Sequence, residues 1–221
     1  PSEAGVFRVM TFDVTGNPAD DDPNGWESRR ELVFDVLADS MADVIGLQGV
    51  TDFQVSQLRR ALPEYKSVAA GSDDGKRGGL TCPILFRSDR FRPADWGTFW
   101  FSNMPWKAGS KHWGNGTPRI CTWVRLTEIA DGNSFYVYNL YLDPDSQVFR
   151  QKSAELLIKE IAHRPVKEPF VVLGDFNMEM DNPAMLYLQK IGCQTPYPRL
   201  VDSWQMLYRA EQSTGTVHRF M

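Results

Sequence analysis

The sequence contains little cysteine and no long apolar run. Its 221 residues include three cysteines, Cys82, Cys121 and Cys193, which cannot all pair within one chain, so we expect no disulfide framework. No run of about 18 apolar residues occurs, and this excludes a membrane-spanning helix. The formal net charge of −4 argues against a protein that binds nucleic acid non-specifically through its whole surface. This charge is compatible with a local basic patch.

The chain does contain enough apolar material for one well-buried domain. Hydrophobic residues make up 42% of the sequence. No repeat, linker or change of composition divides residues 1–221, so we expect a single domain. The chain begins at Pro1 rather than at methionine, which indicates that an upstream segment has been removed. Secretion therefore stays open, and the compartment is not decided by the sequence.

Apolar patterns predict alternating strands and helices. Runs of β-branched and aromatic residues predict strands at 6–14, 43–48, 65–68, 83–87, 91–101, 119–126, 134–142 and 170–173. Helical spacing predicts helices at 26–40, 52–62, 147–162 and 183–190, and a helical segment around 204–207 before a strand-like end. Strand–helix alternation followed by hairpin-like strand pairs is typical of an α/β fold with two sheets between helices.

The most informative stretch is the end of the strand at 170–173. Gly174 permits a sharp turn after the apolar run, and Asp175 and Asn177 lie two residues apart, which points both side chains to one face in extended chain. Oxygen ligands of this kind suit a hard cation or a phosphate site. An Asx turn that closes the strand explains the same residues without a ligand. Both interpretations stay open on spacing alone.

The same stretch carries a family resemblance. The segment Leu173-Gly174-Asp175-Phe176-Asn177, followed by Asn182-Pro183-Ala184, resembles the signature of the endonuclease/exonuclease/phosphatase family, the DNase-like metal-dependent hydrolases. The resemblance runs along nearly the whole chain. It implies a four-layer α/β sandwich, in which two packed mixed β-sheets are flanked by helices. It also implies an ancestral phosphoester hydrolase that uses Mg²⁺ or Mn²⁺.

The resemblance implies a set of site residues. Tyr141 stands where the family has a histidine that contacts the scissile phosphate; a phenol can donate a hydrogen bond there but carries no positive charge. Asp13 stands where relatives have an asparagine near the metal. The implied catalytic residues are Asp175, Asn177, Asn139, Tyr141 and Asp143, and the implied metal ligands are Asp13 and Asp175.

Loops that border the substrate cleft in relatives are rich in aromatic and basic residues here. The resemblance implies substrate contacts from Arg119, Lys76, Trp100 and Trp113, because indole rings can stack on a base or sugar and cations can meet phosphate. The alternative is that the aromatic residues hold a long loop in place while the lysine keeps it soluble. For any single residue this alternative is favoured.

Two departures from the family pattern weaken the expected active site. Gly49 stands where the family carries its principal metal-ligating glutamate, and glycine has no side chain with which to coordinate. The chain ends at Met221, before the Ser-Asp-His segment whose histidine activates water in relatives; His218 is the nearest histidine. The resemblance therefore implies a sandwich without its last strands, and we expect either a neighbouring chain or a rearranged C-terminal region to cover that edge.

Three functional hypotheses follow. The protein is an endonuclease/exonuclease/phosphatase-family phosphoester hydrolase with a compromised active site, or a non-catalytic relative whose cleft binds a ligand or a protein partner. In the third hypothesis Asp13 takes over the metal-binding role lost at Gly49. The expected ligand is a phosphorylated small molecule or a nucleotide, and a homo-oligomer is the expected way to cover the open sheet edge.

Overall fold

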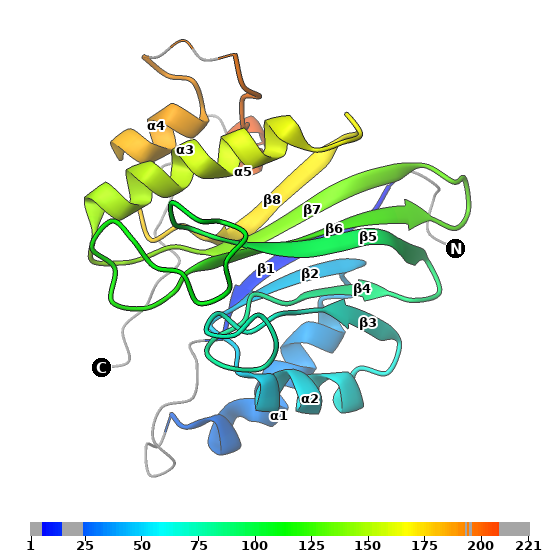
Figure 1. Ribbon diagram of the computed structural model, residues 1–221. Coiled ribbons are helices and arrows are strands. Elements are labelled where there is room, and N and C mark those ends of the chain that lie inside the picture. Colours follow the sequence, from blue (N-terminus) through cyan, green and yellow to red (C-terminus); the bar gives the residue numbers. More distant parts are fainter. Residues whose placement is uncertain (1–5, 15–23, 193, 195, 208–221) are drawn as a thin grey trace.

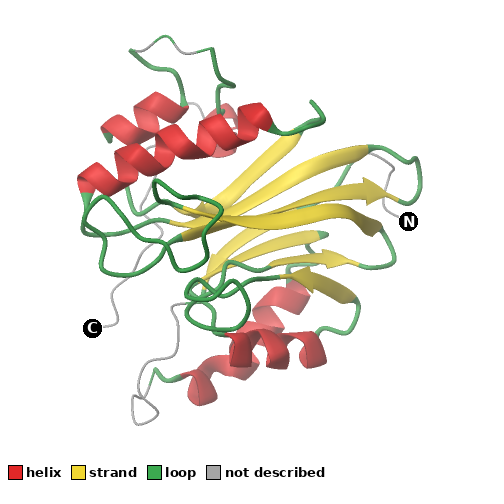
Figure 2. Cartoon of the chain, in the orientation of Figure 1, coloured by secondary structure: helices red, strands yellow, loops and turns green. Residues whose placement is uncertain are grey.

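The structure is a computed structural model that describes residues 6–14, 24–192, 194 and 196–207. Two four-stranded mixed sheets pack face to face in it, and helices cover both outer faces (Figures 1 and 2). This arrangement confirms the expected α/β fold with two sheets between helices. Among the described residues, no helix has the length and apolar character needed to cross a membrane.

The first sheet has the strand order β1-β2-β4-β3. It consists of β1 (Val9–Asp13), β2 (Val44–Gln48), β3 (Tyr65–Val68) and β4 (Ile84–Arg87). Strand β1 runs parallel to β2, and the other neighbours are antiparallel. Every residue of β2 is buried, as expected for a central strand covered on both faces.

The second sheet has the order β5-β6-β7-β8. It consists of β5 (Phe91–Trp100), β6 (Ile120–Glu128), β7 (Ser134–Tyr141) and β8 (Phe170–Asp175). Strands β5, β6 and β7 are antiparallel neighbours, whereas β8 runs parallel to β7. Strand β8 is half-buried along most of its length, because it is the outermost described strand of its sheet.

Helices α1 (Trp26–Asp39) and α2 (Asp52–Ala61) cover the first sheet, and α3 (Gln147–His163) and α4 (Pro183–Leu188) cover the second (Figure 1). Local signals explain where they begin. Thr51 and Gln54 form a reciprocal capping box at α2, Ser146 caps α3, and Asn182 caps α4 ahead of a proline at its first position. The short α5 (Ser203–Leu207) confirms the helical segment expected there; the expected strand-like end and His218 lie outside the described residues.

Parallel pairing determines which side chains meet. In the register of β1 and β2, Asp13 lies opposite Gln48, and in that of β7 and β8, Tyr141 lies opposite Asp175. Contacts between β1 and β8 and between β2 and β7 bring the two parallel pairs together across the sandwich. The carboxyl ends of four strands therefore meet at one end of the molecule.

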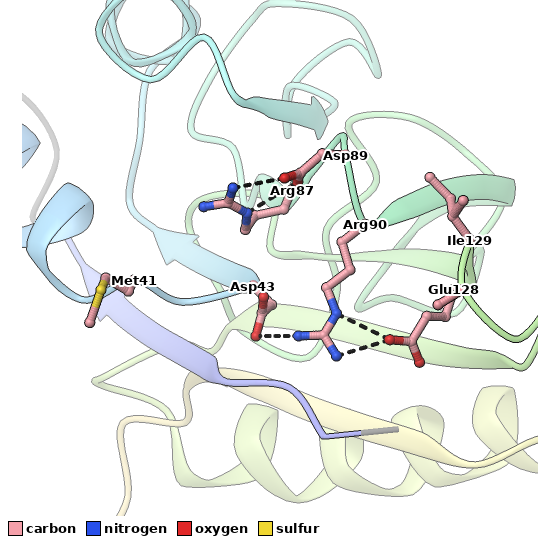
Figure 3. Close-up of a pocket in the computed structure, with 8 residues that line it drawn as sticks. Met41, Asp43, Arg87, Asp89, Arg90, Glu128 and Ile129 are labelled. Carbon is pink, nitrogen blue, oxygen red and sulfur yellow. Dashed lines mark hydrogen bonds and ion pairs between the residues drawn. The ribbon is translucent and has the colours of Figure 1, made fainter. Parts of the chain in front are cut away.

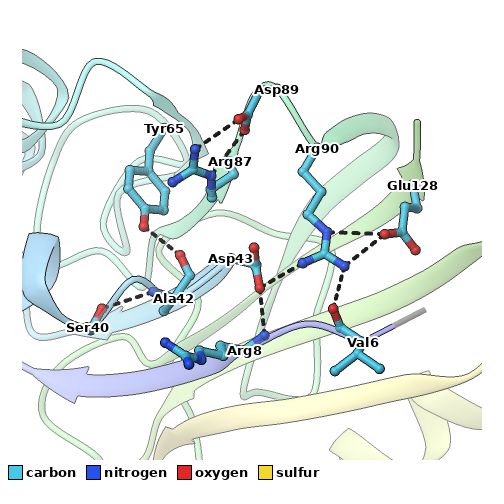
Figure 4. A network of polar contacts seen from close by, with 10 residues as sticks. All are labelled: Val6, Arg8, Ser40, Ala42, Asp43, Tyr65, Arg87, Asp89, Arg90 and Glu128. Atoms are coloured by element: carbon cyan, nitrogen blue, oxygen red, sulfur yellow. Dashed lines mark hydrogen bonds and ion pairs between the residues drawn. The ribbon is translucent and has the colours of Figure 1, made fainter. Parts of the chain in front are cut away.

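An ion-pair cluster lies at the opposite end of the sandwich (Figure 4). The guanidinium of Arg90, just before β5, lies 2.9 Å from a carboxylate oxygen of Asp43, just before β2, and 2.9 Å from one of Glu128, the last residue of β6. The backbone N–H of Arg8 also donates to this Asp43 oxygen, at 2.7 Å. The cluster joins both sheets with its charges paired.

Candidate functional site

Two buried amides join the sheets beneath the carboxyl ends of the strands. The Gln48 side-chain amide donates to Asn139 Oδ1 at 2.6 Å. The Asn139 amide in turn donates to the carbonyls of Leu47 at 2.7 Å and Pro83 at 2.9 Å. Asn139 is fully buried. Its hydrogen bonds point to a positioning role, and its role in catalysis stays a prediction.

Gly46 makes this close approach of the sheets feasible. A Cβ atom at Gly46 would lie 2.9 Å from the Asn139 side chain and from Leu173. Any larger residue would push β2 away from β7 and β8. The glycine in the middle of an apolar strand is therefore explained by close packing between the two sheets.

Tyr141 is the side chain on which the site converges. Its ring lies beneath the Arg119 guanidinium, whose central carbon is 4.6 Å from the ring centroid. Burial raises the pKa of the Tyr141 hydroxyl, and the negative charges of Asp13 and Asp175 raise it further, against the lowering effect of Arg119. Tyr141 is therefore a neutral phenol near pH 7, able to donate a hydrogen bond.

Arg119 is held from the side by Asp143. Its Nε lies 3.7 Å from Asp143 Oδ2, and both side chains are largely buried. Asp143 Oδ1 accepts hydrogen bonds from the backbone N–H groups of Asp145 and Ser146, at 3.0 and 3.1 Å. These bonds fix the carboxylate at the start of α3, so Asp143 orients Arg119 beside Tyr141.

Arg119 and Tyr141 line a cavity of about 300 Å³. The cavity opens between the glycine-rich loop at 71–80 and the segment that leads into β6. Its remaining lining residues are Ser72, Asp73, Gly79, Leu80, Cys82, Thr117, Pro118 and Ile120. The sequence interpretation named none of these as site residues, although the glycine-rich composition of the loop was a signal for close backbone approach.

Asp175 and Asn177 form the Asx turn that was one of the two interpretations of their spacing. The Asn177 backbone N–H donates to Asp175 Oδ1 at 2.8 Å, and the Asn177 amide donates to the Leu142 carbonyl at 2.9 Å. Asn177 has a φ of 50°, a left-handed conformation that asparagine tolerates. The turn does not exclude a ligand site, because the Asp175 charge also acts on Tyr141.

Gly49 immediately follows Gln48, the residue paired with Asp13. Its φ is 65°, a left-handed conformation that costs most other residues about 1–2 kcal/mol. The departure from the family glutamate thus lies beside the expected metal ligands, in a backbone conformation that suits glycine.

Three predicted substrate-binding residues lie away from the cavity lining. Trp100 is buried and its indole N–H donates to the Ser72 carbonyl at 2.6 Å, so it holds the glycine-rich loop in place. The Trp113 indole bonds Asn103 at 2.8 Å and packs near Phe149. Lys76 is exposed on the loop. The alternative of loop anchoring therefore fits Trp100 and Trp113 better than substrate contact, and only Arg119 of the four lines the cavity.

A larger cavity of about 670 Å³ lies at the other end of the molecule, beside Arg90 (Figure 3). Its charged lining residues already pair with each other: Arg90 with Asp43 and Glu128, and Arg87 with Asp89 at 2.9 Å. Size alone is therefore a poor guide, and the smaller cavity, which is lined by Arg119 and Tyr141 at the carboxyl ends of the strands, is the better candidate.

The candidate site holds carboxylates suited to a divalent cation, although the described residues contain no cluster of three or more metal-ligating side chains. Asp13 and Asp175 both act on Tyr141. Mg²⁺ in phosphate-handling sites is bound by one or two carboxylates, with water and substrate phosphate as the other ligands. The residues present meet that minimal requirement.

A two-sheet α/β sandwich with carboxylates at the ends of its parallel strands is typical of DNase-like phosphoesterases. The chain belongs to the Endonuclease/Exonuclease/phosphatase family, whose model matches residues 10–219. None of the curated proteins matches it.

Solved structures support the same assignment. An endonuclease/exonuclease/phosphatase from Bacteroides vulgatus is 32% identical over 83% of this chain and 70% of its own, with a TM-score of 0.80. A mannosyl-6-phosphatase from Bacteroides thetaiotaomicron is 28% identical over 82% of this chain and 69% of its own, with a TM-score of 0.78. TDP2 from D. rerio, complexed with a single-strand DNA product, shares the fold at 18% identity and a TM-score of 0.68, over 93% of this chain and 71% of its own.

Proposed function

We propose that this protein binds a phosphorylated small molecule at the Arg119–Tyr141 cavity and hydrolyses its phosphoester slowly, with Mg²⁺ or Mn²⁺. The observation that carries the proposal is that Tyr141 lies opposite Asp175 in the register of β7 and β8, while the Arg119 guanidinium lies over its ring. Asp13 ends β1, which contacts β8, so in this proposal the cation site lies next to the cavity that Arg119 and Tyr141 line.

The residues have distinct roles in this proposal. Asp13 and Asp175 hold the cation, which when bound neutralises phosphate charge and stabilises the leaving oxygen. Arg119, oriented by Asp143, contacts the phosphate, and the Tyr141 hydroxyl donates a hydrogen bond to a phosphoryl oxygen. Asn139 and Gln48 keep the two parallel strand pairs in register beneath them.

The cavity favours a small substrate. Its volume of about 300 Å³ is at the lower end of the range of about 300–1,000 Å³ found for ligand pockets. Ser72, Asp73 and Thr117 offer polar groups that can bond hydroxyls on the non-phosphate part of the ligand. The similarity to a mannosyl-6-phosphatase supports a sugar phosphate ahead of a nucleotide.

Gly49 is the reason to expect slow turnover. Loss of a metal-ligating carboxylate removes part of the electrostatic stabilisation of the transition state, which is often the largest contribution to catalysis. Restoring the family residue with Gly49→Glu should raise the rate, by about tenfold or more if the carboxylate reaches the cation. Gly49→Ala is the matched control, because it imposes the same backbone strain without a carboxylate.

The test is hydrolysis of mannose 6-phosphate and p-nitrophenyl phosphate with Mn²⁺, Mg²⁺ or chelator. We expect slow, metal-dependent turnover that Asp175→Ala abolishes. If Asp13 has replaced the missing ligand, Asp13→Asn also abolishes it. Turnover that persists in chelator, or that is unchanged in Asp175→Ala, would overturn the proposal.

The second candidate function is ligand binding without catalysis. Gly49 and the neutral Tyr141 favour it, because both replace groups that the family uses for chemistry. Saturable binding of mannose 6-phosphate by calorimetry, with no phosphate released by wild type or Gly49→Glu, would support this candidate against the first.

The exposed sheet edge supports a proposal about assembly. Strands β1 and β8 are the outermost described strands of their sheets, they contact each other, and both are only half-buried. We propose that a second copy of the chain covers this edge, since open edges invite pairing. Analytical ultracentrifugation should show a dimer; a strict monomer with a cooperative melt would contradict it.

A further inference from the structure

A second cavity, of about 150 Å³, lies on the opposite face of the second sheet from Asn139, under the carboxyl-terminal end of α3. Figure 1 shows α3 over this face of the sheet, with its last turn leading toward β8. The cavity is lined by aromatic rings from three strands and by Glu160 and Arg164 from the end of the helix. Nothing in the proposed hydrolysis uses these residues.

The aromatic wall is built by cross-strand pairing. Trp123 on β6 lies opposite Gly97 on β5 and opposite Tyr138 on β7. A Cβ atom at Gly97 would lie 3.0 Å from the Trp123 ring, so the absence of a side chain at Gly97 lets the indole lie against β5. The ring centroid of Tyr136 lies 6.0 Å from that of Trp123, and the Tyr136 ring stacks with the Tyr138 ring at a centroid distance of 6.1 Å. A ligand would therefore meet ring surfaces on one side.

The polar groups of the cavity are incompletely bonded. Among the described residues, Arg164 Nε is buried and has no hydrogen-bond partner, and Tyr138, which is 3% exposed, lines the same cavity. The Glu160 carboxylate likewise accepts no hydrogen bond from the described part of the chain. A buried polar atom without a partner is costly and is normally satisfied, so an acceptor supplied by a ligand would stabilise the Arg164 Nε–H. The half-buried Glu160 carboxylate can accept from a ligand hydroxyl.

Arg164 argues for a neutral ligand. Its guanidinium lies 4.9 Å from the Phe170 ring and 5.9 Å from the Tyr136 ring, and it donates to the carbonyls of Ile161 and Glu168 at 2.6 and 2.8 Å. It is thus a fixed part of the wall. Its positive charge offsets the negative charge of the Glu160 carboxylate. The two side chains together therefore attract neither a cation nor an anion.

We propose that this cavity binds a single neutral, hydroxylated ring, of the class of a pyranose sugar residue. One face of such a ring packs its C–H groups on Trp123 and Tyr136, whose ring faces are electron-rich. One of its hydroxyl oxygens accepts from the Arg164 Nε–H, and another hydroxyl donates to the Glu160 carboxylate. The volume excludes an oligosaccharide but admits one ring projecting from a larger ligand.

The test is ligand-detected NMR titration of the whole protein with methyl α-mannopyranoside and methyl β-glucopyranoside. A ring of this size should bind with a Kd of about 1–10 mM. Tetramethylammonium chloride and inorganic phosphate serve as charged comparison probes. No pyranoside binding at about 100 mM, or tighter binding of either charged probe at this cavity, would overturn the proposal.

Variants locate the binding. Glu160→Ala should weaken pyranoside binding by about tenfold or more and leave Tm unchanged, because this carboxylate has no described hydrogen-bond partner to lose. Glu155→Ala, on the same helix but at its exposed surface, is the matched control and should bind like wild type. Asp175→Ala should also bind like wild type, which separates this site from the proposed hydrolytic one. Equal binding by wild type and Glu160→Ala would refute the assignment.

Discussion

Arg90 at one end of the β-sandwich contacts two carboxylates at 2.9 Å each, whereas Arg119 at the other end lies 3.7 Å from one. Both guanidiniums are largely buried, and both join segments that are distant in sequence. At the Arg119 end two further carboxylates, Asp13 and Asp175, act on Tyr141. The Arg90 end is therefore held by close ion pairs, whereas at the Arg119 end the ion pair is longer and carboxylates stand at the ends of β1 and β8.

This difference separates a structural cluster from a candidate ligand site. Buried ion pairs that satisfy each other hold a fold together but offer no charge to a ligand. Carboxylates beside an arginine can attract a cation, and the cation and the arginine can then bind phosphate. The larger cavity belongs to the end with the close ion pairs, so the length of the ion pairs distinguishes the ends better than volume does.

The largest expected effect is on stability, at the paired end. Arg90→Met leaves Asp43 and Glu128 buried without their cation and should lower the free energy of unfolding by about 3–5 kcal/mol. Arg92→Met, two residues further along the chain and exposed on β5, should change it by less than about 0.5 kcal/mol. Urea unfolding measures both. A loss below about 1 kcal/mol for Arg90→Met would mean that the ion-pair cluster around Arg90 does not hold the fold together.

A smaller loss is expected beneath the candidate site. Asn139→Ala removes the donor to the Leu47 and Pro83 carbonyls and the acceptor for Gln48, and should cost about 2–3 kcal/mol. Asn133→Ala, in the exposed turn before β7, is the control and should cost less than about 0.5 kcal/mol. Equal losses in urea unfolding would show that the buried amides do not join the sheets.

The smallest expected effect concerns the carboxylates of Asp13 and Asp175, at the Arg119 end of the molecule. Inorganic phosphate should raise Tm by about 2–4 °C in the presence of Mn²⁺ and by less than about 1 °C in chelator, because Asp13 and Asp175 repel an anion until a cation is bound. Asp175→Asn should remove the Mn²⁺-dependent increase, whereas Asp145→Asn, on an exposed nearby turn, should retain it. An increase that is independent of metal would make this end resemble a simple anion site.

Much of the fold was predicted from local patterns, because apolar residues recur along the sequence with the period of the strand or helix that they form. The apolar run predicted a strand at 170–173, and β8 covers it and continues to Asp175. Spacing alone did not choose between the Asx turn and a ligand site, since both use the same two side chains. The structure shows the turn, with Asp175 opposite Tyr141 in the register of β7 and β8.

Residue type alone was a poor guide to the roles of the tryptophans. Trp100 has the chemistry of a stacking platform, but its indole N–H bonds Ser72 and its ring is buried. Trp123 was not singled out by sequence, because one indole in an alternating strand resembles any core residue. Only the pairing with Gly97 and the position of α3 show that it lines a cavity.

The sequence by itself determined the family, the order of strands and helices, and the residues at the carboxyl ends of the strands, since these depend on neighbours along the chain. The tertiary structure decided which charges are paired and which cavity they face. Those outcomes depend on contacts between β1, β2, β7 and β8, whose register is set by packing across the sandwich and is not written in any local run of residues.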